Sequence, residues 1–79
     1  MKKKHIKARL LFAANLRQMR ELTKISQEQL GELANLHRTY VSSVERGKRN
    51  VTIDSMEKLA EALKIDIREF LKPHNETAS

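Results

Sequence analysis

Residues 26–49, SQEQLGELANLHRTYVSSVERGKR, decide how this chain folds, because they divide into two short helical stretches with a sharp corner between them. Ser26 and the glutamine three residues later form a capping box, which predicts that the first helix begins here. Asn35 is the best non-glycine residue for the left-handed backbone that ends a helix abruptly. The second helix is predicted over residues 38–46, and Gly47 is typical of the position just after a helix.

Apolar residues at helical spacing predict which side of each helix faces the core. The inward positions are Leu30, Leu33 and Ala34 in the first helix and Val41 and Val44 in the second. Leu36 lies in the corner, where we expect its side chain to fill the space between the two helices.

Longer helices are predicted on either side of this pair. The first covers about residues 6–22, and a fourth covers about 53–63 with Thr52 or Asp54 as its N-cap. Residues 1–5, which include a run of three lysines, are expected to form a flexible basic arm. The inward positions are Phe12, Leu16 and Met19 in the first helix and Ile53, Met56, Leu59, Ala60 and Leu63 in the fourth.

A short fifth helix is predicted near the end of the chain. Asp66 and Glu69 form a second capping box at its start, and Pro73 stops it. Residues 74–79 are polar and are expected to be a flexible tail. We therefore expect residues 1–79 to form one all-α domain of five helices.

The composition agrees with a small helical domain. Of 79 residues, 39% are hydrophobic, and a single proline and two glycines leave long stretches of helix-forming residues. Without cysteine the chain has no disulfide and no cysteine-based zinc site. Neither a membrane-spanning run nor a secretory leader is recognisable, so we expect a soluble, cytoplasmic protein.

Positive charge is concentrated in the part of the chain that holds the two short helices. Residues 1–50 carry twelve Lys and Arg against four Asp and Glu, whereas residues 51–79 carry four against six. Clustered cations bind a polyanion such as DNA with release of counterions. The basic N-terminal two-thirds is therefore the candidate binding surface, although a solvated surface would have the same charge.

Two short helices around a tight corner, with cationic and hydroxyl side chains on the second, are typical of a helix-turn-helix, whose second helix enters the DNA major groove. From about Phe12 to Leu71 the chain resembles the bacterial and phage repressors of the lambda, 434, Cro/C1 or XRE type. The resemblance rests on Arg20, on Ser26-Gln27-Glu28-x-Leu30, and on Arg38-Thr39-Tyr40-Val41-Ser42-x-Val44-Glu45-Arg46-Gly47-Lys48. It implies a compact five-helix lambda-repressor-like fold with the helix-turn-helix at the second and third helices.

Four residues are expected to read DNA bases: Arg38, Thr39, Ser42 and Ser43. An arginine in the first turn of the recognition helix can bond bidentately to guanine O6 and N7, and a threonine offers its hydroxyl or methyl group to a base edge. Ser42 and Ser43 lie one turn further on, and the resemblance favours Ser43 as the more groove-facing residue.

Seven residues are expected to contact the DNA backbone: Gln27, His37, Tyr40, Arg46, Lys48, Arg49 and Asn50. The resemblance implies that Gln27 clamps a phosphate at the start of its helix. Tyr40 adjoins Val41, so a place in the core is its alternative. His37 stands where related chains have Ser, Thr or Asp as N-cap, which predicts a weaker cap and backbone amides left to phosphate or water.

The resemblance also implies a structural ion pair between Arg20 and Glu45. A lone glutamate in a basic recognition segment would repel phosphate if it faced DNA, so an inward orientation is the better interpretation. Lys24 and Lys64 stand where related chains often have the glycine that closes a helix, which leaves the conformation of these two turns open.

Catalysis and metal binding find no support in the sequence. There is no glycine-rich phosphate loop, no HExxH pattern and no metal-ligand spacing among the three histidines, so we expect neither an enzyme nor a cofactor. The remaining alternatives are an antitoxin-like DNA-binding protein and a nonspecific nucleoid protein. Too little chain follows Leu71 for the usual toxin-binding segment, and a nonspecific binder would not need Arg38 and Thr39.

A homodimer is expected because one helix-turn-helix reads only a few base pairs. The predicted interface consists of Ile65, Ile67, Phe70 and Leu71. Among relatives, the Arg-Thr-Tyr-x-Ser helix start and Arg49-Asn50-x-Thr52 most resemble controller proteins of restriction-modification systems, with phage or prophage repressors as the alternative. The expected partners are operator DNA, a second copy and, as a further candidate, RNA polymerase, with no membrane and no small-molecule ligand.

Overall fold

The computed structural model describes residues 7–73, which form four α-helices and one 3-10 helix. The elements in chain order are α1 (Ala8–Thr23), α2 (Gln27–Ala34), α3 (Arg38–Glu45), α4 (Ile53–Leu63) and the 3-10 helix η1 (Ile67–Leu71). Since this range contains no β-strand, the all-helical prediction is confirmed. The predicted basic arm and the predicted tail lie outside the described residues.

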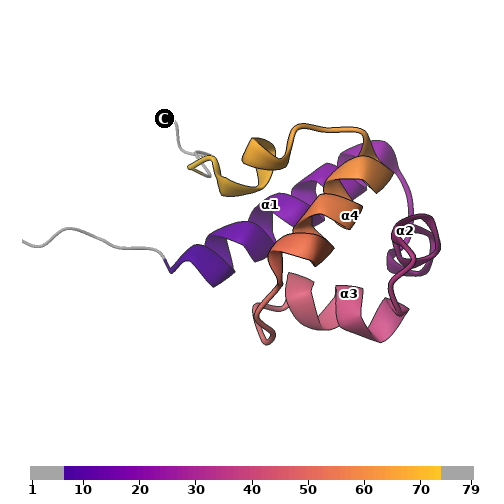
Figure 1. Ribbon diagram of the computed structural model, residues 1–79, viewed down its shortest axis with the longest axis horizontal. Coiled ribbons are helices and arrows are strands. Elements are labelled where there is room, and N and C mark those ends of the chain that lie inside the picture. Colours follow the sequence, from indigo (N-terminus) through magenta and orange to yellow (C-terminus); the bar gives the residue numbers. More distant parts are fainter. Residues whose placement is uncertain (1–6, 74–79) are drawn as a thin grey trace, which may run out of the picture.

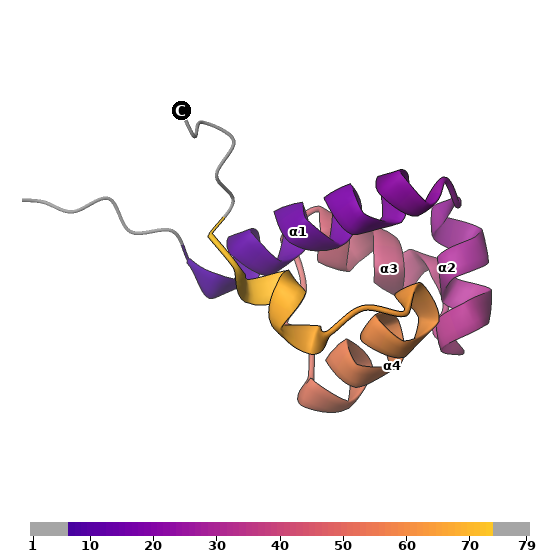
Figure 2. The ribbon, with the colours of Figure 1, turned by 90° about the horizontal axis from the view of Figure 1, so that it is seen from above.

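The helices are arranged so that α3 forms one edge of the molecule. Figure 1 shows α2 at one end of α3 and the loop that leads to α4 at the other end. Figure 2 shows η1 against the first half of α1, and Figure 1 shows α3 on the other side of that helix. Consequently α1 is the scaffold that both the helix-turn-helix and the C-terminal segment contact.

Hydroxyl side chains cap the starts of α2 and α4. At α2, the Ser26 hydroxyl accepts from the Gln29 backbone N–H at 3.0 Å, and Gln29 Oε1 accepts from the Ser26 N–H at 2.8 Å. This is the predicted capping box. At α4, Thr52 and not Asp54 is the N-cap, because its Oγ1 accepts from the Ser55 N–H at 3.0 Å.

Three helices end on a residue with left-handed backbone, although none of the three is glycine. Asn35 has φ of 59°, as predicted for the corner after α2. Lys24 and Lys64 have φ of 62° and 57°, so the two turns that the sequence leaves open take the conformation that glycine would favour. Such a backbone costs a non-glycine residue roughly 1–2 kcal/mol, and packing of the flanking helices must offset it.

The prediction of a fifth α-helix is wrong, because residues 67–71 form only a 3-10 helix. Asp66 does cap its start, accepting from the Arg68 N–H at 2.8 Å, and hydrogen bonding from the Arg68 guanidinium and N–H lowers the pKa of Asp66 to about 2. The capping box is not formed, since Glu69 is paired with Lys72 at 3.0 Å instead. The segment before Pro73 is too short for a regular α-helix to develop.

One hydrophobic core joins all five elements. It consists of Phe12, Leu16, Leu30, Ala34, Val41, Val44, Met56, Leu59, Ala60, Leu63 and Phe70. The prediction that Leu33 and Ile53 lie in the core is wrong, because they are 62% and 70% exposed. The eight-residue α2 turns Leu30, Gly31 and Ala34 inward and leaves Leu33 on the outer side, and Ile53 is the first residue of α4, where the helix is only beginning.

Gly31 is buried in α2 because the backbone after the corner comes very close to it. A Cβ atom at this position would lie 2.6 Å from the Leu36 carbonyl oxygen, which is shorter than van der Waals contact allows. This contact gives no signal in the sequence, since a glycine inside a helix is normally only a loss of helix propensity.

We expect Gly31→Ala to lower the free energy of unfolding by about 1–3 kcal/mol, because the gain in helix propensity is smaller than the cost of moving the Leu36 carbonyl. Urea unfolding measures the change. Glu32→Ala, at an exposed neighbouring position, is the control and should stay within about 0.5 kcal/mol of the wild type. A Gly31→Ala protein as stable as the wild type would show that the corner relaxes freely.

Candidate nucleic-acid interface

The two sides of α3 differ in the way that a recognition helix requires. Val41 and Val44 are buried in the core at 0% and 2% exposure, whereas Arg38 and Thr39 are exposed in the first turn. Two further predicted base-reading residues, Ser42 and Ser43, are half-buried. The outer surface of α3 therefore presents a guanidinium and a hydroxyl at the N-terminal end, where a helix in the major groove contacts base edges.

His37 caps α3 with its imidazole ring, contrary to the prediction of a weak cap with unused amides. The Thr39 backbone N–H donates to His37 Nδ1 at 3.1 Å. Thr39 Oγ1 lies 2.9 Å from the same nitrogen. The ring nitrogen thus takes the part that a Ser, Thr or Asp oxygen has at other N-caps.

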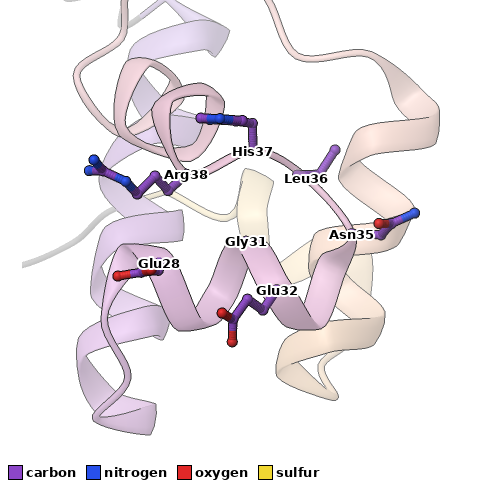
Figure 3. Close-up of a pocket in the computed structure, with 7 residues that line it drawn as sticks. All are labelled: Glu28, Gly31, Glu32, Asn35, Leu36, His37 and Arg38. Atoms are coloured by element: carbon purple, nitrogen blue, oxygen red, sulfur yellow. The ribbon is translucent and has the colours of Figure 1, made fainter.

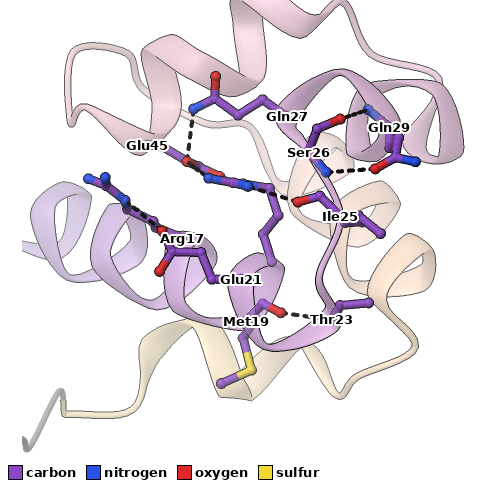
Figure 4. Close-up of polar contacts among 10 residues, drawn as sticks. Arg17, Met19, Glu21, Thr23, Ile25, Ser26, Gln27, Gln29 and Glu45 are labelled. Carbon is purple, nitrogen blue, oxygen red and sulfur yellow. Dashed lines mark hydrogen bonds and ion pairs between the residues drawn. The ribbon is translucent and has the colours of Figure 1, made fainter.

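A network of charged and amide groups holds α3 to the rest of the domain, as Figure 4 shows. The predicted pair of Arg20 and Glu45 is present and bidentate, with N···O distances of 2.6 and 3.0 Å. The two side chains are only 13% and 2% exposed, and the hydrogen bond to Glu45 raises the pKa of Arg20. Arg20 also donates to the Ile25 carbonyl at 2.8 Å, so the loop before α2 is fixed by the same guanidinium.

Gln27, the predicted phosphate clamp, is attached to this network. Its Nε2 donates to Glu45 Oε1 at 2.9 Å, so the carboxamide of the first residue in α2 is held against the last residue of α3. Because an amide nitrogen has two hydrogens, one remains for an acceptor outside the protein. Glu45 faces inward and orients Arg20 and Gln27 together.

The loop after α3 is cationic and lies beside the start of α1. Gly47, the second residue of this loop, has φ of 70°, in the predicted position after the helix. The exposed residues of the loop are Arg46, Lys48, Arg49 and Asn50. Arg46 folds back and donates to the Ser42 hydroxyl at 2.7 Å. Arg9 of α1 donates to Asn50 Oδ1 at 3.4 Å, and sequence reasoning missed this cation because 41 residues separate the two.

Tyr40 lies between the core and the outer surface of α3. Its ring packs on the core, and the Arg49 guanidinium stands over the ring with its carbon 5.2 Å from the centroid. The Tyr40 hydroxyl is buried and has no hydrogen-bond partner among residues 7–73. The ring therefore packs on the core, which was the alternative for Tyr40, and the contact of its hydroxyl with phosphate stays a prediction.

We expect Tyr40→Phe to leave the free energy of unfolding unchanged or to raise it by about 1 kcal/mol, because a buried hydroxyl without a partner is removed. The same change should weaken DNA binding several-fold if the hydroxyl donates to phosphate in the complex. Thermal unfolding and a binding titration measure the two effects. A loss of more than 1 kcal/mol in stability would mean that the hydroxyl is satisfied in the free protein.

An open hollow of about 440 Å³ lies at the corner between α2 and α3. It is lined by Glu28, Gly31, Glu32, Asn35, Leu36, His37 and Arg38. Figure 3 shows Glu28 of α2 and Arg38 of α3 projecting to the same side of this corner. Since Glu28 and Glu32 are exposed and would repel phosphate, the α2 side of the corner is unfavourable for the DNA backbone.

The four residues predicted for a dimer interface do not lie on one surface. Ile65 and Ile67 are half-buried, and Leu71 is 47% exposed. Phe70, however, is 0% exposed and stacks at a tilt on Phe12, with ring centroids 4.7 Å apart. Its side chain belongs to the core of the monomer, so the prediction that it contacts a partner is wrong.

Neither a membrane-spanning helix nor a cluster of metal ligands occurs in the part of the chain that the structure describes. Residues 7–73 contain no helix long and apolar enough to cross a membrane. Over the same range no three His, Cys, Asp or Glu side chains are grouped as metal ligands.

Comparison with known proteins agrees with this geometry. The helix-turn-helix family model matches residues 16–70, which include the whole of α2, α3 and α4. The chain belongs to the XRE-type helix-turn-helix family. Members of this family are DNA-binding transcriptional regulators, and the matched range contains the Arg20 and Glu45 pair as well as the proposed reading residues.

Similar members of the helix-turn-helix family are restriction-modification control proteins. Control protein C.SmaI of Serratia marcescens is 46% identical over 61 residues, covering 77% of this chain and 73% of its own. Control protein C.BamHI of Bacillus amyloliquefaciens is 45% identical over 64 residues, covering 80% and 79%. The crystal structure of the restriction-modification controller protein C.AhdI from Aeromonas hydrophila superposes with a TM-score of 0.77 at 45% identity, covering 78% of this chain and 90% of that one.

Proposed function

We propose that this protein regulates transcription as a homodimer bound to a palindromic operator, in the role of a restriction-modification controller protein. The observation that carries the proposal is the division of α3, with Arg38 and Thr39 exposed and Val41, Val44 and Glu45 buried. The similarity to control proteins supports the biological role. The proposed activity is binding without catalysis, cofactor or small-molecule ligand.

Within this proposal the residues of the interface divide by what they contact. Bases are read by Arg38, Thr39, Ser42 and Ser43. The DNA backbone is held by Gln27, His37, Tyr40, Arg46, Lys48, Arg49 and Asn50. Arg38 contributes most to discrimination, because a bidentate contact with guanine is worth roughly 1–3 kcal/mol.

The dimer is proposed because a reader of four residues covers too few base pairs. Two recognition helices about 34–36 Å apart would read successive half-sites on one side of the duplex. After the correction for Phe70, the proposed interface consists of exposed Leu71 and of Ile65 and Ile67, which are half-buried. RNA polymerase is a further proposed partner, and the bacterial nucleoid in the cytoplasm is the proposed location.

Selection from a pool of randomised duplexes at a stated salt concentration tests the proposal. The expected result is a palindromic consensus bound at least a thousandfold more tightly than random sequence. Sedimentation of the protein alone should show a dimer at micromolar concentration. A flat selection profile would reject the regulator, and a monomer that still selects a palindrome with full affinity would reject the proposed dimer.

A further inference from the structure

His37 lies next to the hydroxyl group of Thr39 at the start of α3. Two groups approach its Nδ1 atom: the Thr39 backbone nitrogen at 3.1 Å and Thr39 Oγ1 at 2.9 Å. A backbone N–H only donates, so a nitrogen that accepts from it carries no proton. The Thr39 hydroxyl can bond to that nitrogen only as a second donor that shares its one lone pair, because two acceptors cannot share a hydrogen bond.

This arrangement fixes the two groups that Thr39 can offer to a base, which are its hydroxyl oxygen and its methyl group. Its hydroxyl proton is directed at His37, so the oxygen presents only lone pairs to the groove. With the oxygen held, the rotamer of the side chain is fixed and its methyl group has one position. Both residues are exposed, so the pair is accessible from outside the domain.

We infer that His37 is a positioning residue that makes Thr39 a hydrogen-bond acceptor for DNA, which rests on the proposed function. The base that meets Thr39 then carries an amino group in the major groove, as adenine does at N6 and cytosine at N4. The carbonyl oxygens of guanine and thymine at the same place are disfavoured, because two acceptors would face each other. This assigns His37 an effect on sequence choice in addition to helix capping.

The test compares His37→Ser with Thr39→Val on duplexes in which each base pair of the selected operator is changed in turn. Serine is a good N-cap and keeps the start of α3, but it does not hold the Thr39 hydroxyl in one direction. Valine keeps the methyl group and removes the oxygen. Thermal unfolding of both variants confirms that they are folded before binding is measured.

The wild type is expected to prefer an amino-bearing base about fivefold at one base pair, as one hydrogen bond provides. Thr39→Val should lose this preference, His37→Ser should lose it at the same base pair, and the double variant should lose no more than Thr39→Val alone. Preferences at base pairs assigned to Arg38 should stay unchanged in all three variants.

Four results would overturn the inference. In the first, His37→Ser keeps the full preference while Thr39→Val loses it. In the second, His37→Ser weakens binding to all duplexes equally, as the loss of a helix cap alone would. In the third, Thr39→Val changes no preference. In the fourth, the preferred base presents a carbonyl oxygen to Thr39. In each of these the operator itself is still selected, so the proposed function stands, whereas a wild type without any sequence preference would overturn both.

Discussion

Replacing Glu45 with alanine is expected to lower the free energy of unfolding by about 3–5 kcal/mol, because the Arg20 guanidinium would stay buried without its partner. Gln27 would also lose its acceptor. A small domain has only about 5–15 kcal/mol of total stability, so much of the protein would be unfolded at physiological temperature. Urea unfolding at neutral pH and low temperature measures the loss.

The matched control is Glu21→Ala, which breaks a second arginine–glutamate pair on the surface. Arg17 and Glu21 are 63% and 58% exposed, so their separation should cost at most about 1 kcal/mol. Equal losses in the two variants would contradict the structural role of Glu45. Joint replacement of Arg20 by Met and Glu45 by Leu should restore part of the stability, since no unpaired charge remains.

Phe70→Ala is expected to cost about 3–5 kcal/mol, because the ring is fully buried and its removal leaves a cavity against Phe12. The Phe70 carbonyl also accepts from buried Asn15 at 2.8 Å, and the same Asn15 amide donates to the Lys72 carbonyl at 2.9 Å. Loss of the ring therefore loosens the segment that α1 holds in place. Chemical unfolding measures the change.

Leu71→Ala is the control for Phe70→Ala. Leu71 is 47% exposed, so this variant should keep nearly all of its stability and weaken only self-association in sedimentation. The account of Phe70 would be contradicted by an unfolding free energy within 1 kcal/mol of the wild type. Weaker self-association of Phe70→Ala would not by itself show that Phe70 contacts the partner, because loss of the ring also loosens the segment that carries Leu71.

Local signals in the sequence predicted the helix boundaries well. The Ser26 and Gln29 capping box, left-handed Asn35 and Gly47 each involve residues within one turn of each other, so their chemistry can be read from neighbours. The exposed sides of short helices could not be read in this way. Leu33 and Ile53 are apolar at plausible spacing, and only the packing of whole helices leaves them in solvent.

In the candidate site, too, local features could be predicted from the sequence and distant contacts could not. The exposed start of α3 was predictable from residue types in the motif. The contacts that decide what each side chain does are long-range or depend on rotamers, as with Arg49 over Tyr40, Gln27 on Glu45 and Arg9 near Asn50. His37 was interpreted as a poor cap because residue preference says nothing about where one ring nitrogen will lie.

The central claim is that Arg38 selects sequence while the cations after α3 only hold the backbone. Its most direct test is the ratio of affinities for the selected operator and for the same duplex with the proposed guanine replaced, measured at one salt concentration for Arg38→Ala and Lys48→Ala. Arg38→Ala should reduce the difference in binding free energy between the two duplexes by about 1–3 kcal/mol, which lowers the ratio. Lys48→Ala should weaken binding to both duplexes equally and leave the ratio unchanged. An unchanged ratio in Arg38→Ala, with both duplexes weakened alike, would contradict the account and make Arg38 a phosphate contact.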